Sequence, residues 1–175
     1  DVLFTGEHVS IASLPGMYER TIPIYTMSKS YAVTGVRVGY IAIQDKKMRA
    51  RAAKVALYTA SNVCSIAQYG AIGALEGPQD CIEEFKTELK IRRDLFYAGL
   101  KDVEGAFYAF VKINQDWARA QGLDKTESVS WTVVEHIIKH SRVGCVPGLD
   151  FGPASEGYIR FCTCRDRKEL SGALE

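Results

Sequence analysis

Lys29 and Arg37 are the residues in this sequence whose type and setting first suggest chemistry. The hydroxyl residues Thr26 and Ser28 precede the lysine, and the arginine follows it eight residues later. A primary amine can hold a small aldehyde covalently, while hydroxyls, backbone N–H groups and a guanidinium are good donors to a phosphate. These four residues therefore fit the binding of a small phosphorylated aldehyde.

Two apolar, β-branched runs enclose these residues, and both are typical of β-strands. The first run is residues 22–25 and the second is residues 36–43, with a polar loop expected at residues 26–30. Two strands cannot bury both faces of a sheet alone. We therefore expect this stretch to contribute two strands to a larger sheet.

Helix and strand patterns alternate along the rest of the chain, which indicates an α/β protein. The predicted helices are residues 46–57, 61–76, 79–100 and 128–140, with a last helix that starts at Asp166. The predicted strands are residues 105–113, 143–146 and 158–163. Asp45 is the expected N-cap of the first of these helices, and Gly77 with Pro78 is expected to end the second.

Arg160 alternates with Ile159 and Phe161 in the last predicted strand. Successive side chains of a strand point to opposite faces, so we expect the arginine on the face away from these two apolar residues. Such an arginine is either partly buried with a carboxylate partner or an exposed charge at a sheet edge. The pattern alone leaves both alternatives open.

The segment around Lys29 resembles the lysine motif of the fold-type I pyridoxal-phosphate (PLP) aminotransferases, the class I/II or aspartate aminotransferase superfamily. The family pattern is roughly S/T-x-S-K-x-x-x-x-x-G-x-R-x-G-Y. The matching residues here are Thr26-Met27-Ser28-Lys29 and Gly35-Val36-Arg37-Val38-Gly39-Tyr40. Three further segments are similar to family motifs: residues 65–72, residues 105–108 (G-A-F-Y, with Val103 in place of a proline) and residues 151–160 (F-G … R). The resemblance covers nearly the whole chain.

This resemblance implies transfer of an amino group between an L-amino acid of the aspartate, alanine or aromatic type and a 2-oxo acid, with pyridoxal 5′-phosphate as cofactor. It implies that Lys29 forms the Schiff base with the cofactor and is the catalytic residue. It implies that Thr26, Ser28 and Arg37 also bind the cofactor, with Arg37 on its phosphate. Arg160 would bind the α-carboxylate of the substrate.

The same resemblance implies an α/β fold with two parts. Residues 1–95 would be the C-terminal part of the PLP-binding large domain, whose mixed, mostly parallel sheet has helices on both faces. Residues 96–175 would be a small C-terminal α/β domain, truncated at its end. The family's pyridine-nitrogen aspartate and ring tyrosine precede the point where this chain begins. The connecting segment between Leu100 and Gly105 is also shorter than the one usually found in the family. We therefore expect a C-terminal half that is inactive alone and belongs to a homodimeric enzyme.

Two alternatives remain open at this stage. A PLP lyase or synthase of the same fold, which catalyses β- or γ-elimination, would share both Lys29 and Arg160. A catalytically silent domain or cleavage product would share them too, without the chemistry. The residues that separate a transaminase from a lyase lie mostly upstream.

Composition argues against several other classes of protein, including nucleic-acid-binding, membrane-spanning and disulfide-rich proteins. The 175 residues are 47% hydrophobic and 25% charged, with a formal net charge of +1, which offers no electrostatic case for nucleic acid or an anionic membrane. No apolar run approaches the roughly 18 residues that span a bilayer. Five scattered cysteines favour a reducing cytoplasm over a disulfide scaffold, and Cys162 and Cys164 are expected to be buried thiols. His136 and His140 lie four residues apart, but we expect no metal site there.

Overall fold

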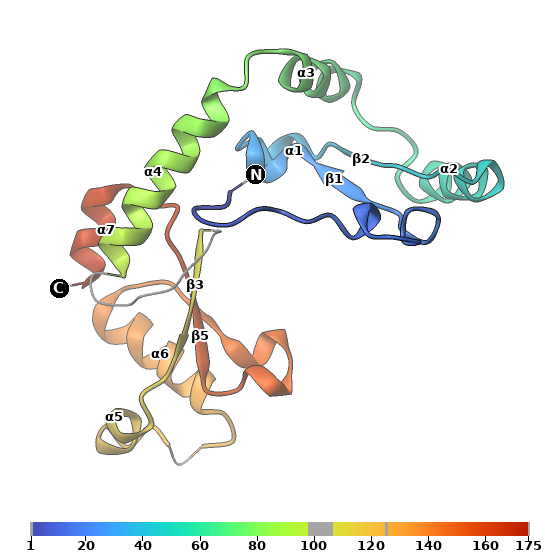
Figure 1. The fold of residues 1–175 in the computed structure, drawn as a ribbon. Helices are drawn as coiled ribbons and strands as arrows, with labels where there is room; N and C mark the ends of the chain where they lie inside the picture. Colours follow the sequence, from blue (N-terminus) through green and yellow to red (C-terminus); the bar gives the residue numbers. More distant parts are fainter. Residues whose placement is uncertain (1, 98–106, 125, 175) are drawn as a thin grey trace. The chain divides into compact units, whose positions relative to one another are not determined.

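The chain forms two compact units in a computed structural model that describes residues 2–97, 107–124 and 126–174 (Figure 1). Unit 1 is Asp1–Lys86 and unit 2 is Thr87–Glu175, so the boundary lies inside helix α4 (Asp80–Phe96). The alternation of helices and strands confirms the predicted α/β class. The assignment of residues 1–95 and 96–175 to a large and a small domain stays a prediction.

Unit 1 contains a pair of short strands and several helices. Its strands and helices are β1 (Ile24–Thr26), α1 (Met27–Ser30), β2 (Gly39–Ile41), α2 (Lys46–Ala60) and α3 (Ser65–Glu76), with single 3-10 turns η1 (Ile11–Ser13), η2 (Tyr18–Arg20) and η3 (Thr34–Val36). Strands β1 and β2 are antiparallel, with Ile24 opposite Ile41. Both strands are exposed along their whole length. The segment predicted as a polar loop is instead the single helical turn α1.

The helix ends in unit 1 follow from local capping. Asp45 accepts a hydrogen bond from the backbone N–H of Met48 at 2.6 Å, which confirms the predicted N-cap of α2. The helix predicted from residue 61 begins only at Ser65. Ser61 has a positive φ of 56° and caps the C-terminus of α2, so the chain leaves helical geometry there. Gly77 ends α3, as predicted.

Unit 2 is built on a three-stranded antiparallel sheet in the order β3-β5-β4. Its strands and helices are β3 (Tyr108–Lys112), α5 (Gln115–Ala120), α6 (Val129–Ser141), β4 (Val146–Pro147), β5 (Tyr158–Cys162) and α7 (Arg167–Leu174), with 3-10 turns η4 (Gly148–Phe151) and η5 (Pro153–Ser155). Leu100 and Gly105 lie outside the described residues. The sequence did not predict α5, which Asn114 caps by accepting two backbone N–H bonds at 3.0 Å.

The hydrophobic core of unit 2 lies between α6 and the sheet. Five buried side chains form it: Ile113, Ala118, Val133, Val134 and Ile159. Phe161 packs against the same cluster. Figure 1 shows α6 running alongside β3 and β5. One face of the sheet is therefore covered by a helix.

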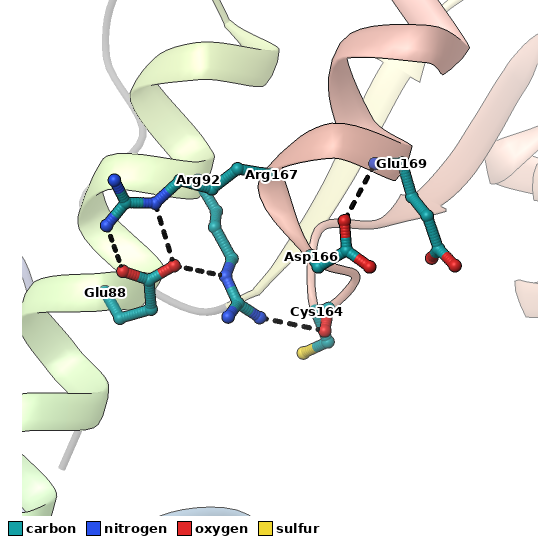
Figure 2. Close-up of polar contacts among 6 residues, drawn as sticks. All are labelled: Glu88, Arg92, Cys164, Asp166, Arg167 and Glu169. Carbon is teal, nitrogen blue, oxygen red and sulfur yellow. Dashed lines mark hydrogen bonds and ion pairs between the residues drawn. The ribbon is translucent and has the colours of Figure 1, made fainter.

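An ion-pair network joins α4 to α7 within unit 2 (Figure 2). The Glu88 carboxylate accepts from Arg92 Nε at 2.8 Å and from both Nε and Nη2 of Arg167. Arg92 also donates to the carbonyl oxygen of Cys164 at 3.0 Å. The hydrogen bonds from Arg167 and Arg92 lower the pKa of Glu88 from 4.5 to about 2. Asp166 caps α7 by accepting from Glu169 N at 2.9 Å, which confirms the predicted start of that helix.

Cysteine burial differs from the expectation. Cys162 and Cys164 are both exposed rather than buried. Cys162 is the last residue of β5, and Cys164 lies between β5 and α7. Burial raises the pKa of the more interior thiol, Cys145, to about 11.

Candidate active site

Strands β1 and β2 hold the predicted site residues of unit 1 in place. Tyr25 lies opposite Tyr40, and the two rings stack with centroids 4.8 Å apart. Gly39 lies opposite Thr26, and a Cβ at Gly39 would come within 2.4 Å of the carbonyl oxygen of Tyr25. The close strand approach therefore requires glycine at this position.

Thr26 connects the end of β1 to the helical turn that carries the lysine. Its Oγ1 accepts the backbone N–H of Ser28 at 3.2 Å, and the two hydroxyl oxygens are 3.0 Å apart. This bond is the N-cap of α1, which explains why residues 27–30 form a turn of helix rather than a loop. Lys29 is exposed on that turn, and Met27 anchors it by being buried.

Arg37 lies between η3 and β2, as the C-cap residue of η3. Its backbone is left-handed, with φ of 56°, and its Nη1 donates to the carbonyl oxygen of Thr34 at 3.0 Å. A pocket of about 360 Å³ is lined by residues of β1 and β2 together with Ser28 and Arg37. Thr26, Ser28 and Arg37 thus meet at one pocket. Lys29 adjoins Ser28 in the chain, but it is not among the residues that line this pocket.

Arg160 lies on β5, the central strand of unit 2, opposite Phe110 of β3 and Val146 of β4. Ile159 and Phe161 contact the core, so the predicted alternation of faces is confirmed. The alternative of an exposed charge at a sheet edge is wrong, because β5 is the central strand. Arg160 is partly buried, and no carboxylate of the described residues forms an ion pair with it.

Aromatic rings take the place of a carboxylate partner around Arg160. The guanidinium carbon is 4.5 Å from the centroid of the Tyr108 ring and 4.7 Å from that of Phe151. Cation–π contacts hold a guanidinium plane without using its N–H donors. Arg160 is therefore oriented and half-buried, with donors left for an anion. Sequence reasoning missed these rings, although the aromatic alternation of Tyr108 and Phe110 along β3 was a usable signal.

Glu156, just before β5, is a second residue that sequence reasoning missed. Its Oε1 accepts the backbone N–H of Ser130 at 2.9 Å, and its Oε2 accepts the Ser128 hydroxyl at 3.0 Å. Burial raises the pKa of Glu156, but these hydrogen bonds outweigh it and hold the pKa below its ordinary value. Nothing in the local sequence points to these partners, which lie 26 and 28 residues away.

The described residues supply no group of three or more His, Cys, Asp or Glu side chains that could hold a metal ion. His136 and His140 stack instead, with ring centroids 4.1 Å apart. Among the helices of residues 2–97, 107–124 and 126–174, none is long and apolar enough to cross a bilayer.

Fold and site together define an α/β protein with a pocket that two hydroxyl residues, Thr26 and Ser28, and the arginine Arg37 help to line. The family described as aminotransferase class I and II matches residues 3–175, and the chain belongs to this family. It is 35% identical to the "Probable aspartate aminotransferase" of Methanocaldococcus jannaschii over 89% of this chain and 41% of that protein. It is 33% identical to "Aromatic-amino-acid aminotransferase 2" of Thermococcus litoralis, over 97% of this chain and 43% of that one.

A solved structure is similar as well. The crystal structure of an aromatic aminotransferase from Pyrococcus horikoshii matches with a TM-score of 0.84 and 35% identity, over 99% of this chain and 46% of that chain. The chain thus spans less than half the length of each of these three proteins.

Proposed function

We propose that this chain is part of a PLP-dependent aminotransferase that moves an amino group between an L-amino acid and a 2-oxo acid. The observation that carries the proposal is the convergence of Thr26, Ser28 and Arg37 on one pocket beside Lys29. The names of the relatives favour amino acids of the aspartate or aromatic type. Family membership favours transamination over the elimination chemistry that the same fold supports.

The donor set of unit 1 fits pyridoxal 5′-phosphate. A phosphate needs several hydrogen-bond donors and a permanent positive charge, which two hydroxyls and a guanidinium supply. Arg37 uses one N–H on Thr34 and keeps other donors for the phosphate. We assign covalent attachment of the cofactor aldehyde to the amine of Lys29.

The bound cofactor would supply an electron sink for the α-carbon of the substrate. We assign to Nζ of Lys29 the role of general base, which takes the proton from that carbon. In unit 2 we assign the substrate α-carboxylate to Arg160, whose planar guanidinium suits a two-point contact with a carboxylate. Tyr108 and Phe151 would keep this guanidinium in one orientation.

We also propose that the protein acts in the cytoplasm as a homodimer. Its five cysteines all lie among the described residues and are not joined in disulfides, which fits a reducing compartment. Unit 1 exposes large apolar side chains that favour association. They include Ile24, Tyr40, Ile41, Val55, Tyr58, Ile66 and Tyr69.

Covalent labelling tests the assignment of Lys29. The protein is incubated with pyridoxal 5′-phosphate and reduced with borohydride, and the modified peptide is then identified by mass spectrometry. We expect the pyridoxyl group on Lys29 and loss of the visible absorbance band on reduction. Lys54→Ala, which changes an exposed lysine of α2, should keep the label, and Lys29→Ala should lose it. A label on another lysine of the wild type would refute the proposal.

A further inference from the structure

Glu156 joins the turn before β5 to the first turn of α6. Its carboxylate accepts from the backbone N–H of Ser130 and from the hydroxyl of Ser128, the N-cap residue of α6. The N-terminus of a helix has unsatisfied N–H groups and a partial positive charge, so a carboxylate is stabilised there. Glu156 is therefore a fixed point between two elements that are far apart in sequence.

The adjacent residue, Gly157, extends this anchor into the sheet. Its backbone N–H donates to the hydroxyl of Ser130 at 2.8 Å, and its carbonyl oxygen accepts from the N–H of Ile113 at 2.8 Å. Ser130 is 0% exposed, so its hydroxyl depends on these partners. Gly157 has φ of 82°, a conformation that side chains rarely adopt. The residue before β5 is therefore fixed by hydrogen bonds to Ser130 at the start of α6 and to Ile113 next to β3.

The hydrogen bonds of Glu156 and Gly157 also bear on the position of Phe151, one of the two rings that contact Arg160. Phe151, which stacks on Arg160, lies in the segment that ends at Glu156. This segment folds back tightly, because a Cβ at Gly148 would come within 2.1 Å of the carbonyl oxygen of Ser155 and 2.7 Å of that of Tyr158. Moving its end would move both the strand that carries Arg160 and the loop that carries Phe151.

We propose that Glu156 is a positioning residue for Arg160, acting through the start of β5 and the loop of Phe151. The inference rests on the proposed function, in which Arg160 binds the substrate carboxylate. Glu156 makes no contact of its own with the substrate in this role. It holds the guanidinium where its free N–H donors can meet a carboxylate.

The test uses NMR of the Arg160 Nε–H signal and titration with succinate as a simple carboxylate probe. In the wild type, the rings of Tyr108 and Phe151 should shift this signal away from that of a free arginine. Glu156→Ala should move the signal toward the free value and weaken succinate binding roughly tenfold, because small displacements of a binding group reduce its effect strongly. In the whole enzyme of which this chain is proposed to be part, KM for an amino-acid substrate should rise more than kcat falls. Glu156→Gln, which keeps an acceptor for the Ser130 N–H, should recover most of the affinity.

Controls separate positioning from stability and from the proposed function. Glu135→Ala, which removes an exposed carboxylate of α6, the helix that Glu156 caps, should leave the Arg160 signal and the succinate affinity unchanged. If Glu156→Ala does not fold, Glu156→Asp, whose shorter side chain withdraws the carboxylate, replaces it with the same expectation. A folded variant with an unchanged Arg160 signal and unchanged affinity overturns the inference. If Arg160→Gln itself leaves succinate binding unchanged, the substrate-binding role of Arg160 fails instead.

Discussion

Val133→Ala is a direct test of where the stability of this chain resides. Val133 lies on α6, is 2% exposed and packs in the core of unit 2 with Ile113, Ala118 and Ile159. Within the described residues, the buried hydrophobic side chains of unit 1 are Met27 and Ala67. We therefore expect unit 2 to unfold as a cooperative structure with its own core.

The expected loss of stability can be worked from the burial of this side chain. Truncation to alanine removes two methyl groups, each worth about 0.8 kcal/mol in transfer from water. The cavity left behind, on the order of 40 Å³, adds about 1 kcal/mol at roughly 24 cal/mol per Å³. The free energy of unfolding should fall by about 2.5 kcal/mol in total, a large effect for one substitution.

Tryptophan fluorescence during urea denaturation is a selective assay for this loss. The two tryptophans of the chain are Trp117 on α5 and Trp131 on α6, so the signal reports unit 2. With a denaturant slope of about 1–3 kcal/mol per M urea, the midpoint should fall by about 0.8–2.5 M.

A matched control uses the same helix. Ile138 is 45% exposed, so Ile138→Val should lower the free energy of unfolding by only about 0.4 kcal/mol. Equal destabilisation by the two substitutions, or an unchanged midpoint for Val133→Ala, would show that this cluster is not the core of the unit.

Two further predictions concern charged residues. Arg160→Lys should weaken binding and turnover of amino acids by about 3 kcal/mol, because a lysine loses the two-point carboxylate contact and both ring contacts. The cofactor content, measured by absorbance, should stay unchanged. Unaltered kinetics would refute the role of Arg160 in binding the substrate carboxylate. The pKa of Glu88 is lowered in the folded state from 4.5 to about 2, so its contribution to stability is present above pH 4.5 and is lost as the pH falls through about 2. The difference in melting temperature between wild type and Glu88→Gln should therefore be constant above that range and vanish near its lower end; a difference that persists there would contradict the assignment.

The sequence by itself determined the features that depend on near neighbours in the chain. The caps Asp45, Ser128 and Asp166 each bond a backbone N–H three residues on, and all three start helices at or next to the predicted residues. The alternation of side chains along a strand likewise predicted that Arg160 and Ile159 lie on different faces of the sheet. Capping and alternation use contacts within one turn or one strand, so pattern is sufficient to find them.

The predictions for residues 26–30 and for the start of α3 were wrong, and the cause in each case is a local feature of the chain. The residues 26–30 form helix α1 because the Thr26 hydroxyl caps it, a signal that the sequence contains but that the flanking strands obscured. The delayed start of α3 depends on the positive φ of Ser61, which residue type does not indicate. The left-handed backbone of Arg37 likewise cannot be predicted from the sequence, because arginine does not favour this conformation.

Only the tertiary structure decided how the charged residues are held. Glu88 meets Arg167 across 79 residues of sequence, and Glu156 meets Ser130 across 26. The rings around Arg160 come from another strand and from a loop, so their approach depends on strand register and on the fold of residues 148–158. These contacts form only after distant segments pack, and no periodicity in the chain encodes them.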